Sequence, residues 1–137
     1  MAYRAAICDD CAADAQFVSE ILKAWADERG AEVNAEIYPS AESFLFAYDE
    51  NKAYDMLLLD IEMGGMDGVS MARRVRAGNK TVQIIFITGY SDYIAEGYDV
   101  AALHYLMKPV NREKLFGVLD RAVERLKISQ RCLNLDM

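Results

Sequence analysis

Short apolar runs alternate with segments of helical period along the whole chain. The runs predict five strands, at about Tyr3–Cys8, Val33–Tyr38, Asp55–Leu59, Val82–Ile87 and Leu103–Met107. The third run is apolar in nearly every position, which is typical of a strand covered on both faces. Strands that alternate with helices form right-handed crossovers and a parallel sheet. We therefore predict an α/β fold, a doubly wound five-stranded parallel sheet with helices on both faces.

Between these runs, residues of helical period predict five helices. They span about residues 13–29, a segment that begins after Ser40, and residues 68–77, 92–100 and 112–129. In the first helix, Phe17, Ile21 and Trp25 are spaced to share one buried face, and Gly30 closes the helix. Ser40 has the side chain of an N-cap for the second helix. The last helix carries an apolar stripe made of Leu115, Val118, Leu119, Ala122, Val123 and Leu126.

The bulk composition indicates one globular domain. The chain has 137 residues, of which 53% are hydrophobic and 27% charged. No apolar run approaches the roughly 20 residues that span a bilayer, and the first residues lack the pattern of a signal peptide. We therefore expect a cytoplasmic protein with no membrane contact.

Charge and cysteine content argue against two classes of site, a nucleic-acid interface and a cysteine-based redox or zinc site. The net charge of −7 disfavours binding to a nucleic-acid backbone, because such binding requires clustered Lys and Arg. Cys8 and Cys11 have the spacing of some redox and zinc sites, but no second such pair accompanies them. The only histidine, His104, is distant in the sequence. We interpret these cysteines as incidental buried or loop residues in a reducing compartment.

Polar residues follow four of the predicted strands. Asp9 and Asp10 follow the first, Asp60 the third, Thr88 ends the fourth, and Lys108 follows the fifth. In a parallel sheet these positions meet at the carboxyl edge, where open α/β sheets bind ligands. Three carboxylates placed together repel one another unless a cation binds, and oxygen-rich sites with few protein ligands suit Mg²⁺ beside a phosphate group. Lys108 adds a positive charge, the Thr88 hydroxyl can donate to a phosphoryl oxygen, and a carboxylate such as Asp60 can be a phosphoryl-transfer nucleophile.

Each of these signals also has a structural reading. An Asp-Asp pair after a strand often forms a turn and a helix cap. Thr88-Gly89 is a common start of a loop, and Lys108-Pro109 by itself indicates only an extended or turn dipeptide. The functional interpretation depends on all the signals together, each placed after its own strand.

Taken together, the motifs resemble the receiver domain of two-component response regulators, over about residues 3–127. The matching segments are Ile7–Asp10, Leu57–Met63 with Met66–Gly68, Ile87–Gly89 and Tyr105–Val110. The resemblance implies a flavodoxin-like fold with strand order 2-1-3-4-5. It also implies a receiver domain at residues 1–127, with residues 128–137 as a C-terminal tail or the start of a linker. Residues 95–106 further resemble receivers that are attached to LytTR-type DNA-binding domains.

The resemblance implies a role for each strand-end residue. Asp60 would be the phosphoacceptor, supplied by the phosphohistidine of a sensor histidine kinase. Asp9 or Asp10, or both, together with Asp60 and the backbone carbonyl of Glu62, would hold Mg²⁺. Lys108 would pair with the phosphoryl oxygens, and its peptide bond to Pro109 is expected to be cis.

A second pair would report the phosphorylation. Thr88 and Tyr105 match the residues whose hydroxyl and ring move when a receiver is phosphorylated, a two-state element biased by a local charge. Gly64 stands where the family usually has proline, which predicts a looser loop. Glu62 and Tyr90 match positions near the path of the hydrolytic water, so we expect them to influence the phosphoryl lifetime.

The resemblance also implies partners and leaves alternatives. A homodimer through the fourth helix, fifth strand and fifth helix is expected. The domain itself would contact no nucleic acid, and DNA would be reached only through an output domain absent from this chain. One alternative is a small Mg²⁺-dependent phosphohydrolase with an aspartyl nucleophile, although Glu62 stands where such enzymes usually carry a second Asp. Another is a receiver-like scaffold that signals without phosphorylation.

Overall fold

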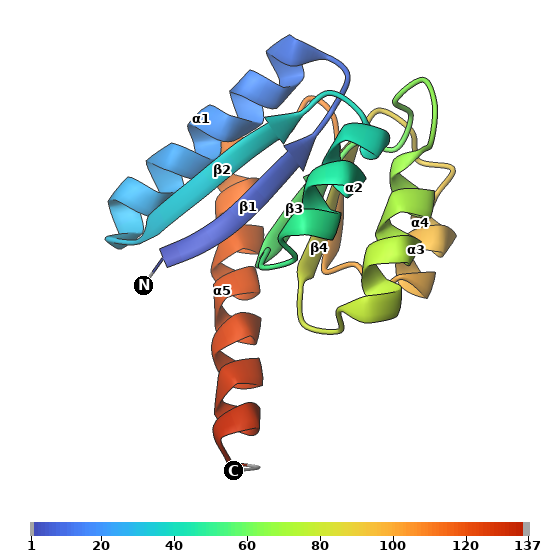
Figure 1. The fold of residues 1–137 in the computed structure, drawn as a ribbon. Coiled ribbons are helices and arrows are strands. Elements are labelled where there is room, and N and C mark those ends of the chain that lie inside the picture. The colour runs from blue at the N-terminus through green and yellow to red at the C-terminus, as the bar shows by residue number, and fades with distance from the viewer. Residues whose placement is uncertain (1, 136–137) are drawn as a thin grey trace.

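The computed structural model describes residues 2–135, and the side chains of residues 2–129. Strands and helices alternate throughout, as the sequence predicts (Figure 1). The elements in chain order are β1 (Ala2–Cys8), α1 (Ala12–Arg29), β2 (Glu32–Tyr38), α2 (Ala41–Glu50), β3 (Met56–Leu59), α3 (Gly68–Gly78), β4 (Gln83–Thr88), α4 (Ile94–Asp99), β5 (His104–Met107) and α5 (Arg112–Leu135).

All five strands pair in parallel in the order β2-β1-β3-β4-β5, so the predicted fold and strand order are confirmed. Because successive side chains of a strand point to opposite faces, each central strand contributes to two cores. Met56 and Leu58 of β3 face α1 and α5, whereas Leu57 and Leu59 face the core that α2 and α3 cover. The carboxyl ends of β1 and β3 are therefore held rigidly between two packed layers.

Two local signals are confirmed, and one predicted burial is wrong. Gly30 ends α1 at φ 63°, in the left-handed region that favours glycine, and the Ser40 hydroxyl caps α2 by accepting from the Ser43 N–H. Phe17, however, is 48% exposed, whereas Ile21 and Trp25 are buried. The buried face of α1 is centred on Val18, Leu22 and Trp25, and Phe17 lies on its flank.

The last two helices differ in length from the prediction. α4 covers only Ile94–Asp99, shorter than the expected 92–100, because no side chain caps its N-terminus and Gly97 weakens a helix interior. α5 continues to Leu135, six residues beyond the expected end, and its final turns extend past the sheet in Figure 1. Within residues 2–135, no helix has the length and apolarity that crossing a bilayer requires.

Arg76 of α3 binds the backbone before β4 and after α4. Its guanidinium donates to the carbonyl oxygens of Val100 (2.8 Å) and Ala101 (3.2 Å), which follow α4. It also donates to the carbonyl oxygens of Asn79 (3.2 Å) and Val82 (2.8 Å), which precede β4. One side chain thus satisfies four backbone acceptors and fixes the C-terminal end of α4 against α3.

A second polar contact joins α1 to α5 near the end of α1, beside the start of β1. Asp120 of α5 accepts from the Trp25 indole N–H (2.9 Å) and from the Arg29 guanidinium (2.9 and 3.0 Å). The Arg29 hydrogen bond holds the pKa of Asp120 below its usual range, against the opposing effect of burial. The two helices that cover this face are therefore joined by a charged contact as well as by apolar packing.

Candidate functional site

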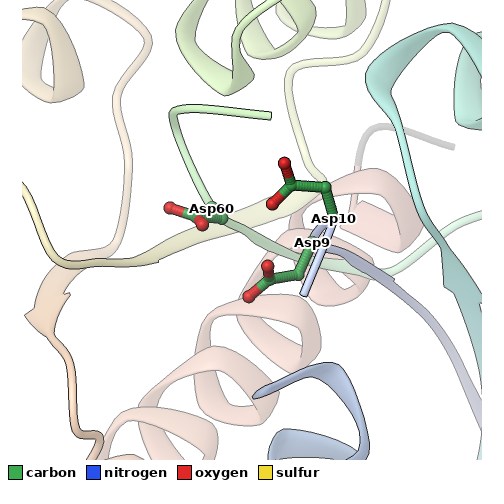
Figure 2. A group of neighbouring side chains, drawn as sticks. All are labelled: Asp9, Asp10 and Asp60. Atoms are coloured by element: carbon green, nitrogen blue, oxygen red, sulfur yellow. The ribbon is translucent and has the colours of Figure 1, made fainter. Parts of the chain in front are cut away.

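Three aspartates meet where β1 and β3 end, as the sequence predicts. The side chains of Asp9, Asp10 and Asp60 each place one carboxylate oxygen within 4.8 Å of the others (Figure 2). Asp9 and Asp60 are only 5% and 7% exposed, whereas Asp10 is exposed. The group is therefore a partly buried concentration of negative charge, open to solvent on the side of Asp10.

Backbone contacts at the strand ends orient the two buried carboxylates. The Asp60 N–H donates to the Cys8 carbonyl (2.9 Å), which extends the ladder between β1 and β3 by one residue. The Asp60 Oδ1 accepts from the Ile61 N–H (2.7 Å), and the Asp9 Oδ1 accepts from the Cys11 N–H (2.9 Å). Each carboxylate thus has one oxygen bound to the backbone and directs the other oxygen toward Lys108.

Lys108 enters this group from the opposite side, after β5. Its ammonium lies 2.9 Å from Asp9 Oδ2, 3.0 Å from Asp60 Oδ2 and 2.8 Å from Asp14 Oδ2. Its peptide bond to Pro109 is cis, as expected. Burial alone would lower the pKa of Lys108, but the hydrogen bonds with Asp14, Asp9 and Asp60 outweigh burial and raise it. Lys108 is therefore a fixed positive charge in the site.

Asp14 is the member of this site that the sequence reasoning missed. It lies in the first turn of α1, and its contact with Lys108 joins residues 94 positions apart. In the sequence, an acidic residue in a first helical turn indicates only a favourable interaction with the helix dipole. The hydrogen bond from Lys108 holds the pKa of Asp14 below its usual range.

The donor set fits Mg²⁺. Magnesium takes six oxygen ligands at about 2.1 Å, so its ligand oxygens lie roughly 3 to 4 Å apart, and one oxygen from each of Asp9, Asp10 and Asp60 lies within 4.8 Å of the others. The pKa of the Asp9 carboxyl is raised, mainly by burial and also by the charge of Asp60. The hydrogen bonds from Lys108 and Cys11 act in the opposite direction. A cation beside these residues would offset the free-energy cost of keeping the buried, mutually repelling carboxylates ionised.

The loop after Asp60 is more firmly held than its two glycines suggest. The Glu62 side chain is exposed, and Gly64 has φ 69°, a conformation that disfavours other residues. The Glu42 carboxylate of α2 accepts from the Met66 N–H at 3.0 Å and fastens the loop to a neighbouring helix. The prediction of a looser loop considered only the glycines and not the hydrogen bond from Met66 to Glu42, which restrains the loop.

Thr88 and Tyr105 both bind the backbone of Tyr90. The fully buried Thr88 hydroxyl accepts weakly from the Tyr90 N–H at 3.4 Å. The Tyr105 hydroxyl donates to the Tyr90 carbonyl, while its half-buried ring contacts Phe86 with 5.9 Å between ring centres. Thr88 and Tyr105 are thus connected through a single intervening residue, Tyr90.

The amino-acid sequence is similar to proteins of the response regulator family. A family model described as the response regulator receiver domain matches residues 6–120. The transcriptional regulatory protein RprY of Bacteroides fragilis is 32% identical over 116 residues, which cover 83% of this chain and 48% of RprY. The sensory transduction protein LytT of Bacillus subtilis is 31% identical over 83 residues, covering 59% of this chain and 34% of LytT. The chain thus spans half or less of the length of these curated relatives.

Solved structures share the fold. The BeF3-activated receiver domain of DrrB, a Thermotoga maritima protein, superposes with a TM-score of 0.75 at 25% identity. The match covers 90% of this chain and 99% of that domain.

Proposed function

Because the chain belongs to the family of response regulator receiver domains, we propose that it is a signalling switch controlled by phosphorylation of Asp60. Receiver domains are phosphoacceptors in signalling and not conventional enzymes, and a histidine kinase is the partner that the family implies. The observation that carries the assignment to Asp60 is its nearly buried carboxylate, placed 3.0 Å from Lys108 and beside two further aspartates.

In the proposed reaction, one carboxylate oxygen of Asp60 attacks the phosphorus of a phosphohistidine. A P–O bond forms while the P–N bond breaks, and the electron pair of the broken bond stays on the imidazole nitrogen. Lys108 neutralises charge on the phosphoryl oxygens from the side opposite Asp10. A Mg²⁺ held by Asp9, Asp10, Asp60 and the backbone carbonyl of Glu62 would supply further neutralisation of those oxygens.

The response would pass through Thr88 and Tyr105. A phosphoryl group on Asp60 offers new acceptors to the Thr88 hydroxyl, whose one side-chain hydrogen bond within the described residues is a long one accepted from the Tyr90 N–H. When the hydroxyl turns to the phosphoryl oxygen, space opens for the Tyr105 ring, and its bond to the Tyr90 carbonyl is lost. The switch is therefore between an outward ring, bound to Tyr90, and an inward ring.

We propose that the face of α4, β5 and α5 reads out this change by pairing with a second copy. Exposed apolar side chains gather at α4 and β5: Tyr90 (47%), Ile94 (47%), Tyr98 (83%) and Met107 (43%). Such side chains are common in the buried centres of protein interfaces. The Tyr105 hydroxyl binds Tyr90, and Ile94 and Tyr98 line a surface cavity together with Tyr105, so movement of its ring would reshape this face.

We further propose a LytTR-type DNA-binding output domain outside this chain, in a cytoplasmic transcription regulator. The match to LytT and the length of the curated relatives support this proposal. The acidic net charge of −7 supports a receiver that does not touch DNA itself.

The direct test is phosphorylation with a small donor. We expect acetyl phosphate with Mg²⁺ to add one phosphoryl mass to the wild type and none to Asp60→Asn, as measured by intact mass spectrometry. Asp27→Asn, on the exposed side of α1, is the matched control and should be labelled like the wild type.

Two results would contradict the proposal. Equal labelling of wild type and Asp60→Asn would exclude Asp60 as the acceptor. Sustained release of phosphate over many turnovers would favour a phosphohydrolase instead of a switch.

A further inference from the structure

Asp14 is the third carboxylate that the Lys108 ammonium contacts, after Asp9 and Asp60. A lysine ammonium has three N–H donors. In this structure they face three carboxylate oxygens, of Asp9, Asp60 and Asp14, at 2.9, 3.0 and 2.8 Å. No donor remains for a phosphoryl oxygen until one of these bonds breaks.

We propose that Asp14 is a positioning residue that restrains Lys108 and slows phosphorylation of Asp60. The inference rests on the proposed function, because it concerns how readily Lys108 becomes available to the phosphoryl group. It also identifies which bond is exchanged: Asp14 releases Lys108, and a phosphoryl oxygen takes its place.

Burial distinguishes Asp14 from the other two partners of Lys108. The side chains of Asp9 and Asp60 are 6% and 8% exposed and have a second oxygen bound to the backbone. The Asp14 side chain is 46% exposed and projects from a helix, not from a strand end. Its bond is therefore the one that can open without disturbing the sheet.

Space beside the ammonium allows this release. A small cavity of about 60 Å³ lies against Lys108 and Asp14, with Phe17 and Pro109 in its wall. The half-exposed Phe17 ring that the sequence reasoning expected in the core lies here instead, at the rim of the site. Because the Asp14 side chain is 46% exposed, it can leave Lys108 by turning toward solvent.

Asp14 also adds negative charge at the place where an anionic donor arrives. Two unit charges about 6 Å apart in water interact by an amount that corresponds to roughly a threefold change in rate. The loss of restraint on Lys108 acts in the same direction. We therefore expect Asp14→Asn to accelerate phosphorylation by acetyl phosphate roughly three- to tenfold.

The experiment compares wild type, Asp14→Asn, Asp14→Ala and Asp14→Glu in initial rates with acetyl phosphate and Mg²⁺, followed by intact mass. Both Asn and Ala should be faster than wild type, and Glu, which keeps the ion pair, should return toward the wild-type rate. Asp27→Asn removes the same charge from α1 about 20 Å farther along the helix and should leave the rate unchanged.

A second measurement needs neither Mg²⁺ nor phosphate. Hydrogen exchange at the Lys108 ammonium, followed by ¹⁵N NMR of the metal-free protein, reports how tightly its N–H donors are held. We expect exchange to be several-fold faster in Asp14→Asn than in wild type, with Asp27→Asn unchanged.

Failure of the inference and failure of the proposed function are distinguishable. If Asp60 in the wild type is not labelled, the proposed function is wrong. If the wild type is labelled and the Asp14 variants match it in rate and in ammonium exchange, Asp14 does not restrain Lys108. A slower rate in Asp14→Asn would likewise overturn the inference, because it would mean that Asp14 assists the reaction.

Discussion

Asp10 lies beside two other carboxylates at the edge of the sheet. It lies within 4.8 Å of Asp9 and Asp60, and unlike them it has no contact with Lys108 among the described ion pairs. In the metal-free protein its charge therefore meets mainly repulsion. We predict that Asp10→Asn stabilises the metal-free protein.

The magnitude follows from the spacing. At 4.8 Å, the upper limit of these oxygen separations, two unit charges interact by about 0.9 kcal/mol in water, so two neighbours give about 1.7 kcal/mol before screening. Salt and the positive charge of Lys108 reduce this to about 1 kcal/mol. For a chain of 137 residues, such a gain corresponds to a rise in Tm of roughly 3 °C.

Mg²⁺ should reverse the order of stability. A ligand at ten times its Kd stabilises the native state by about 1.4 kcal/mol. Because Asp10→Asn removes one of the three carboxylates, most of this gain should be lost in the variant. Wild type should thus be the less stable protein with EDTA and the more stable one with millimolar Mg²⁺.

The assay is thermal unfolding followed by circular dichroism, with EDTA or Mg²⁺ and at low and high salt. The difference in Tm between Asp10→Asn and wild type should shrink as salt is added. Asp27→Asn, an exposed aspartate outside the site, should change neither Tm nor its response to Mg²⁺. A lower Tm for metal-free Asp10→Asn, or an unchanged response to Mg²⁺, would refute the reasoning.

Three further predictions concern contacts that support the site. Arg76→Met should lower the free energy of unfolding by about 2 kcal/mol in urea titrations, because four backbone carbonyls lose a charged donor; an unchanged midpoint would contradict this. Glu42→Gln should speed amide hydrogen exchange at Met66 several-fold by weakening the tether, whereas an unchanged rate would show that the tether is dispensable. Arg29 keeps the folded pKa of Asp120 below the unfolded value of about 3.9, so the stability from this pair is present above that pH and lost on acidification. The stability gap between wild type and Asp120→Asn should accordingly shrink from pH 5 to pH 3, and a constant gap would argue against the pair.

Features that depend on local periodicity were predictable from the sequence. The alternation of apolar runs and helical segments determines the parallel sheet, and Ser40 and Gly30 mark helix ends by their own conformational preferences. The meeting of Asp9, Asp10 and Asp60 was predictable for a related reason, because every strand of a parallel sheet ends at the same edge.

Other features were decided only by the packing of distant segments. The bond between Asp14 and Lys108 and the tether from Glu42 to Met66 depend on how α1 and α2 lie across the sheet. Helical period identifies an apolar stripe but does not set its centre, which is why Phe17 lies at the rim of the site and not in the core. The sequence by itself thus determined that Asp9, Asp10, Asp60 and Lys108 gather at the sheet edge. The tertiary structure decided which carboxylates Lys108 binds, Asp14 included, since that depends on distances of about 3 Å between residues far apart in the chain.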